Sequence, residues 1–141
     1  MNYEELMLRA ITKAEKFKYT AKPNPVVGAI IIKNNEIISE GYHEVYGKNH
    51  AEINAIEEAQ KHLGKKFQSF SELTLICTLE PCSHIGKTGS CADFIVKTGF
   101  KNVIIGAIDP NPKVAGNGIK ILEANKAVSY THLTLPTIYS V

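Results

Sequence analysis

The sequence lacks the features that mark a membrane or a secreted protein. Its longest apolar run, Val26 to Ile32, is far shorter than the roughly 18 residues that a helix needs to cross a bilayer. The N-terminus carries two acids, Glu4 and Glu5, where a secretory signal would carry basic residues followed by an apolar stretch. We therefore expect no transmembrane segment and a cytoplasmic location.

A large excess of charge of either sign is also missing. Sixteen Lys and Arg residues against 14 Asp and Glu residues give a formal net charge of +2, which gives no support to a dedicated nucleic-acid binder. Cysteine is scarce and odd in number, with three residues, so we expect no closed disulfide framework. In a reducing compartment, close-set cysteines more often bind metal or take part in catalysis.

What is present fits one globular domain. The chain has 141 residues, of which 44% are hydrophobic, and this suffices for a single core. The apolar periodicity predicts an α-β-β-α-β-α-β-α order, with a hairpin followed by right-handed parallel crossovers. The hairpin is expected to turn tightly at residues 33–36, because Asn34 and Asn35 tolerate positive φ. We therefore expect an α/β protein, a three-layer α/β/α sandwich with a mixed sheet. The predicted helices are 3–18, 49–63, 91–98 and 119–125, and the predicted strands are 26–32, 37–42, 73–78 and 102–108.

The C-terminal segment differs in composition from the rest of the chain. Residues 127–141 contain no Asp, Glu, Lys or Arg. Their alternation of Thr and Leu is compatible with a native edge strand, but they also resemble translated adaptor or vector read-through. We expect residues 1–126 to form a C-terminally truncated domain and residues 127–141 to be a non-native tail, with a native strand and tail as the alternative.

Two segments carry the residues for chemistry: His50-Ala51-Glu52 at the start of the second helix, and residues 81–91 before the third. His50, Cys82 and Cys91 offer one imidazole and two thiolates, a set that Zn²⁺ binds. Three protein ligands leave a fourth tetrahedral position for water, which permits catalysis. Both His50 and Cys91 are expected at helix N-termini, where the partial positive charge favours a thiolate over a thiol.

Each of these residues also has a simpler interpretation. Asn49 followed by Glu52 fits a capping box, and an isolated His or Cys is often a surface or core residue. The combination of His-x-Glu with Pro-Cys-x8-Cys about 30 residues later nevertheless favours zinc. Cys77 lies in a predicted apolar strand, and we interpret it as a packing residue. If Cys77 were a fourth ligand, the site would be closed and structural.

These motifs resemble those of the zinc-dependent nucleoside and base deaminases, whose signature is His-x-Glu followed by Pro-Cys and a second Cys. Most branches keep two residues between the cysteines, whereas eight separate Cys82 from Cys91. This longer spacing is similar to that in the deaminase domains of bifunctional riboflavin-biosynthesis proteins. Three further segments carry the same resemblance, which spans residues 3–126: PNPVVG (23–28), GYHEVYG (41–47) and DPNPKVAGNG (109–118).

The resemblance implies a cytidine deaminase-like fold and hydrolytic deamination of diaminohydroxyphosphoribosylaminopyrimidine, the second step of riboflavin biosynthesis. It implies that His50, Cys82 and Cys91 hold Zn²⁺ and that Glu52 carries the proton. It also implies contacts to the pyrimidine or its ribose phosphate from Asn24, His43, Lys87, Asp109 and Asn111, with His84 and Thr88 as weaker candidates.

The residues alone leave alternatives open. Asn24 and Asp109 lie beside prolines and fit turn positions, and Lys87 fits a solvated loop cation. Two other functions also remain: a deaminase of a free nucleoside, a base or a transfer RNA, and an inactive zinc-binding fragment.

The partners expected from the sequence are limited. We expect a small phosphorylated pyrimidine as the substrate, and neither nucleic acid nor membrane as a partner. The reductase domain of bacterial family members has no counterpart in this chain, so no nicotinamide cofactor is assigned. Homo-oligomer formation is left open.

Overall fold

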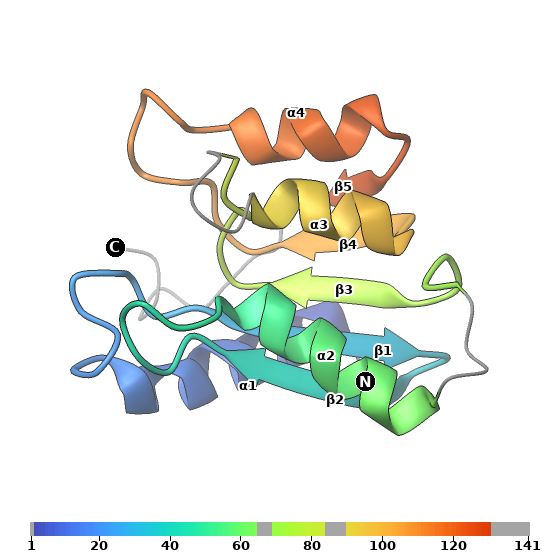
Figure 1. The fold of residues 1–141 in the computed structure, drawn as a ribbon, viewed down its shortest axis with the longest axis horizontal. Helices are drawn as coiled ribbons and strands as arrows, with labels where there is room; N and C mark the ends of the chain where they lie inside the picture. Colours follow the sequence, from blue (N-terminus) through green and yellow to red (C-terminus); the bar gives the residue numbers. More distant parts are fainter. Residues whose placement is uncertain (1, 65–68, 84–89, 131–141) are drawn as a thin grey trace.

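A five-stranded mixed sheet forms the centre of the computed structural model, which describes residues 2–64, 69–83 and 90–130 (Figure 1). The strand order is β2-β1-β3-β4-β5. β1 runs antiparallel to both β2 and β3, whereas β3, β4 and β5 are mutually parallel. The strands are β1 (Gly28–Lys33), β2 (Glu36–Tyr42), β3 (Thr74–Cys77), β4 (Asn102–Ile105) and β5 (Val128–Tyr130).

Helices cover both faces of this sheet, which confirms the predicted three-layer sandwich. In Figure 1, α1 lies behind the sheet, and α2 and α3 lie in front of it. α4 packs against α3 and β5 at the far edge. The helices are α1 (Tyr3–Ala14), the 3₁₀ turn η1 (Glu15–Phe17), α2 (Ala51–Leu63), α3 (Cys91–Thr98) and α4 (Asn117–Ala124).

Two hydrophobic clusters, one on each face, hold the layers together. Ile30 packs with Leu6 and Met7 of α1, whereas its neighbour Ile31 packs with Ile56 of α2 on the opposite face. β1 is therefore buried on both faces, as its unbroken apolar sequence predicts. Full burial of one such side chain contributes about 1.5–3 kcal/mol, so this strand anchors both layers.

The predicted hairpin joins β1 to β2. Asn34 and Asn35 have φ angles of 50° and 66°, the left-handed values that a two-residue turn of type I′ requires at both central positions. Asparagine tolerates this region better than most residues, because its short polar side chain can bond locally. The turn prediction is confirmed.

Several predicted boundaries differ from the observed ones by a few residues. The first helix ends at Ala14 and tightens into η1, rather than continuing to residue 18, and the first strand starts at Gly28 rather than Val26. β3 and β4 stop at Cys77 and Ile105, and α4 already begins at Asn117. Just after β3, the N–H of Thr78 donates to the carbonyl of Gly28, and its hydroxyl accepts from the N–H of Gly28, each at 3.0 Å.

The charge-free segment, whose pattern is compatible with an edge strand, contributes β5 through its first residues. It pairs in parallel with β4. Residues 131–141 of that segment lie outside the described residues, and its non-native origin stays a prediction. Within the described part of the chain, no helix is both long and apolar enough to cross a membrane.

Candidate active site

The segments that carry the candidate catalytic and metal-binding residues meet at one end of the central strands. β3 and β4 end there, and because β1 and β2 form an antiparallel hairpin, the start of β1 and the end of β2 lie at the same end. The helices α2 and α3 both begin above it, with His50 as the N-cap of α2 and Cys91 as the first residue of α3. Residues far apart in sequence are thereby brought together.

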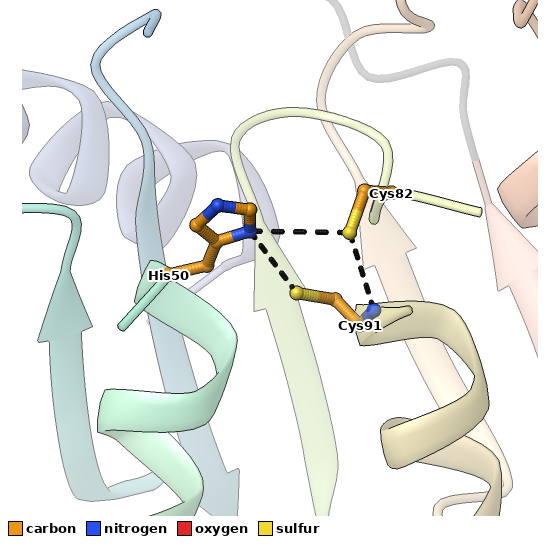
Figure 2. Close-up of side chains that lie close together, drawn as sticks. All are labelled: His50, Cys82 and Cys91. Atoms are coloured by element: carbon orange, nitrogen blue, oxygen red, sulfur yellow. Dashed lines mark hydrogen bonds between the residues drawn. The ribbon is translucent and has the colours of Figure 1, made fainter. Parts of the chain in front are cut away.

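His50, Cys82 and Cys91 form a compact cluster (Figure 2). Nδ1 of His50 lies 3.2 Å from Sγ of Cys91 and 3.9 Å from Sγ of Cys82. The backbone N–H of Cys91 donates to the sulfur of Cys82 at 3.2 Å. The three ligand atoms all lie within 4.8 Å of one another.

These distances fit a zinc ion. Zn–N bonds of about 2.0–2.1 Å and Zn–S bonds of about 2.3 Å in a tetrahedral arrangement place nitrogen and sulfur about 3.6 Å apart. The two observed Nδ1–Sγ distances, 3.2 and 3.9 Å, lie on either side of this value. One imidazole and two sulfurs are also the donor types that zinc prefers, so the cluster is suited to Zn²⁺ by both geometry and chemistry.

The local electrostatics favour a thiolate in this cluster. The hydrogen bond from the Cys91 thiol lowers the pKa of Cys82 to about 4. The same bond, together with burial, raises the pKa of Cys91, and a hydrogen bond to Cys82 raises the pKa of His50. These contacts favour the anionic form of Cys82, and a metal requires such an anionic sulfur as its ligand.

Glu52 lies in the first turn of α2 and is only 3% exposed. Burial raises the pKa of this carboxyl above its ordinary value, although contacts with its own N–H, His50 and Cys91 oppose the shift. The capping-box alternative is not formed, because the N-cap is His50, without a capping side-chain bond, rather than Asn49. The side chain faces a cavity instead.

That cavity, of about 160 Å³, lies against the cluster. Glu52, Asn24, His43 and Asp109 all contribute to its wall, together with two of the proposed ligands. Its lining residues are Asn24, Pro25, Val27, His43, His50, Glu52, Leu79, Glu80, Cys82 and Asp109.

His43 and Asn24 form a bonded pair in this wall. Nδ1 of His43 faces the carbonyl of Asn49 at 3.1 Å and must donate to it, because a carbonyl only accepts. Nε2 of His43 then carries the lone pair and accepts from Nδ2 of Asn24 at 3.0 Å. Both ring nitrogens of His43 are thus engaged within the protein, and the ring orients the Asn24 amide.

Of the other predicted substrate contacts that the structure describes, one lines the cavity and one does not. Asp109 is half-buried and lines the cavity, and its carboxylate also accepts from the N–H of Asn111 at 2.9 Å, as a turn residue does. Asn111 is exposed and is not among the lining residues of the cavity. Lys87 lies outside the described residues, as do His84 and Thr88.

Cys77 is fully buried in β3 and packs in the core between the sheet and the front helices. The metal-ligand cluster found among the described residues does not include it. This placement matches its interpretation as a packing residue. Among the residues that the structure describes, the cluster therefore offers three protein ligands, the number that an open catalytic site uses.

Glu80 is a cavity residue that the sequence analysis missed. It is 6% exposed, and its carboxylate binds backbone N–H groups of the segment that carries Asp109. The sequence did offer a signal, since Glu80 stands between a buried strand and the Pro81-Cys82 motif. A carboxylate buried at such a position needs hydrogen-bond partners.

The comparisons with known proteins agree with this geometry. Residues 1–107 match the family model for the cytidine and deoxycytidylate deaminase zinc-binding region. Two proteins from two subspecies of Buchnera aphidicola, both named diaminohydroxyphosphoribosylamino-pyrimidine deaminase, are 48% and 49% identical to the chain. These matches cover 82% and 87% of this chain and 74% and 79% of those proteins.

A solved structure from Thermotoga maritima, a diaminohydroxyphosphoribosylaminopyrimidine deaminase/5-amino-6-(5-phosphoribosylamino)uracil reductase, is 44% identical with a TM-score of 0.81. The match covers 92% of this chain and 36% of that one, so the chain spans about a third of the bifunctional protein. With the family match over most of its length and a His-Cys-Cys cluster suited to zinc, the chain belongs to the cytidine and deoxycytidylate deaminase family.

Proposed function

We propose that this chain is a zinc-dependent hydrolase that deaminates diaminohydroxyphosphoribosylaminopyrimidine, the second step of riboflavin biosynthesis. The observation that carries the proposal is the presence of Glu52, His50 and Cys82 in the wall of one cavity, with Cys91 completing the ligand cluster beside it. A metal site with an adjacent carboxyl is the arrangement that zinc deaminases use on an aromatic amine. The names of the Buchnera relatives support this pyrimidine as the substrate.

His50, Cys82 and Cys91 would hold the zinc ion through Nδ1 and the two sulfurs. When bound, zinc lowers the pKa of a coordinated water to about 7 and so supplies a nucleophile at neutral pH. The start of α3 assists the ligands, because the Cys91 N–H already donates to the Cys82 sulfur and stabilises its negative charge.

Glu52 carries the proton. Its carboxylate accepts a proton from the attacking water and later donates it to the leaving amino nitrogen. A C–O bond forms, the C–N bond breaks, and water and substrate become the carbonyl product and ammonia. The burial that raises the pKa of Glu52 suits this role, because the carboxyl must hold the proton between the two steps.

Asn24 and Asp109 would bind the substrate from two other segments of the wall. Because His43 accepts from Nδ2 of Asn24, the Oδ1 atom of this amide is left to accept a hydrogen bond from a substrate amine. His43 would then act through Asn24 by fixing its orientation. Lys87 and Asn111 remain predicted contacts to the pyrimidine or its ribose phosphate.

Ammonia release from three substrates tests the proposal. The substrates are the phosphorylated diaminopyrimidine, deoxycytidylate and an adenosine-containing transfer-RNA hairpin. We expect turnover of the diaminopyrimidine alone, and turnover of either other substrate alone would overturn the substrate assignment. One equivalent of bound zinc with no ammonia from any substrate would favour an inactive zinc-binding fragment.

The same activity suggests the setting of the protein. We place the deaminase activity within residues 1–126 and the protein in the cytoplasm, acting on a small molecule. Deletion of residues 127–141 would test the domain assignment: activity and zinc content should survive it.

A further inference from the structure

The carboxylate of Glu80 binds four backbone N–H groups at once. Oε1 accepts from Asp109 at 3.1 Å and from Gly116 at 2.9 Å. Oε2 accepts from Gly118 at 2.8 Å and from Ile119 at 3.2 Å. A buried side chain from the loop after β3 thus holds both the start of the segment 109–116 and the first turn of α4.

The neighbours of Glu80 tie the same loop to the metal cluster. The N–H of Glu80 donates to the carbonyl of Ala107 at 2.8 Å, and the carbonyl of Cys82 accepts from the N–H of Ala92 in α3 at 3.0 Å. Gly118 approaches the backbone of Pro81 so closely that an added Cβ would overlap the Pro81 carbonyl oxygen. The tripeptide from Glu80 to Cys82 therefore links the start of α3 to the start of α4.

This link bears on the cavity because Asp109 lines it. Within its own segment, Asp109 is held by local turns: its carboxylate accepts from the N–H of Asn111, and Asn111 Oδ1 accepts from the N–H of Lys113. Such local bonds shape the turn but do not orient it against the rest of the protein. The bond from the Asp109 N–H to Glu80 does.

We propose that Glu80 is a positioning residue for substrate binding: by holding the backbone of Asp109 and of the start of α4, it keeps the Asp109 side chain at the cavity wall. The proposal deepens the proposed function and depends on it for the identity of the substrate. Glu80 moves no proton in this scheme, and Glu52 keeps that role.

Glu80→Gln is the sharpest test, because the change is nearly isosteric. Glutamine has one oxygen that accepts and an NH₂ group that only donates, so one of the two N–H pairs loses its acceptor. We expect faster hydrogen exchange at the pair of amides that loses its acceptor, either Asp109 with Gly116 or Gly118 with Ile119. We also expect a KM raised by about tenfold or more, a kcat within a fewfold of the original, and zinc retained at one per chain.

Glu40→Gln is the matched control. Glu40 also joins two elements through several hydrogen bonds, from Arg9 and Lys13 of α1, but it does not line the cavity. Its loss should leave KM and the four exchange rates unchanged. Glu80→Asp is the second variant. It keeps the negative charge on a side chain shorter by one methylene, and it should raise KM by less than Glu80→Gln does.

A double mutant separates positioning from general weakening. If Glu80 acts through Asp109, Glu80→Gln should add little to the KM of Asp109→Asn, whereas independent effects would multiply. Multiplying effects, an unchanged KM, or exchange rates that stay as in the original protein would overturn the proposal. If the original protein releases no ammonia, the proposed function fails, and the exchange rates still decide whether Glu80 holds this segment.

Discussion

The two walls of the cavity each present a buried glutamate, and the two are held in different ways. Glu52 on α2 is 3% exposed and Glu80 before Pro81 is 6% exposed. The two oxygens of Glu80 accept hydrogen bonds from four backbone N–H groups. Burial raises the pKa of Glu52, and the contacts that lower this pKa, with its own N–H, His50 and Cys91, do not cancel the rise. Burial alone therefore does not define a proton carrier.

The difference follows from the elements that carry the two residues. Glu52 lies in the first turn of its own helix, and the backbone N–H that acts on its carboxyl is its own. Glu80 faces the start of α4, where the first N–H groups of a helix have no intrahelical acceptor. The first carboxyl is left able to exchange a proton, and the second completes a helix end.

The largest expected effect comes from Glu52→Gln, which removes the proton carrier while keeping the shape. We expect kcat to fall by about 10²–10⁴, the usual contribution of general acid–base catalysis, with zinc retained at one per chain. Steady-state ammonia release and metal analysis measure both quantities. Near-normal turnover would show that Glu52 is not the proton carrier. Glu80→Gln serves as the comparison, because its kcat should change little.

The next largest effect should come from Gly118→Ala, which disturbs the packing of the start of α4 against the segment that carries Glu80. The added Cβ would overlap the carbonyl of Pro81, a backbone atom that no rotamer change can move aside. We expect a loss of about 3 kcal/mol in the free energy of unfolding, measured by urea denaturation.

Gly116→Ala is the control in the same segment. Gly116 also donates to Glu80 and has a φ of 84°, but an added Cβ there meets nothing within 4 Å. Its cost should be about 1 kcal/mol, from the left-handed backbone alone. Equal losses in the two variants would mean that the close approach to Pro81 does not hold the start of α4.

Much of this arrangement could be predicted from sequence, because the signals were local. Residue types at fixed spacing identified the cluster of His50, Cys82 and Cys91, and two adjacent asparagines identified the hairpin turn. The Glu80 bonds could not be predicted in this way. Their donors are backbone N–H groups 29 to 39 residues away, and backbone groups are present at almost every position whatever the residue.

The element ends were also hard to predict, for a related reason. An apolar run such as 102–108 continues past the last ladder bond, and the end of β4 at Ile105 is set by its parallel partner β3, which stops at Cys77. The two ring contacts of His43 likewise depend on the backbone of Asn49 and on the Asn24 amide, which only the folded chain brings together.

A smaller effect should appear in stability against pH. Because the pKa of Glu52 is raised in the folded protein, the unfolded chain ionises first, and folding is penalised as pH rises above the ordinary value of 4.5. In zinc-free protein, Glu52→Gln should therefore be more stable than the original at pH 7, with the gain vanishing below about pH 4. Urea denaturation across this range checks it, and a gain that grew towards low pH would contradict the sign.

The smallest effect on stability is expected for Glu40, a carboxylate outside the cavity. Glu40 on β2 pairs with Arg9 and Lys13 of α1, and its side chain is 18% exposed. Burial would raise the pKa of Glu40, but the hydrogen bonds from Arg9 and Lys13 outweigh burial and hold it below its ordinary value of 4.5. Unlike Glu80, this residue is bonded by partly exposed side chains, and ion pairs near solvent contribute little.

Glu40→Gln should therefore lower the free energy of unfolding by less than about 1 kcal/mol at pH 7. Because the pKa of Glu40 is lowered on folding, its contribution is present above pH 4.5 and is lost as pH falls through the folded value. High salt should also shrink it, since the exposed guanidinium of Arg9 is readily screened. Urea denaturation at pH 7, at about pH 3 and in high salt measures all three. A loss well above about 1 kcal/mol at pH 7 would mean that these cations hold Glu40 more firmly than a partly exposed ion pair does.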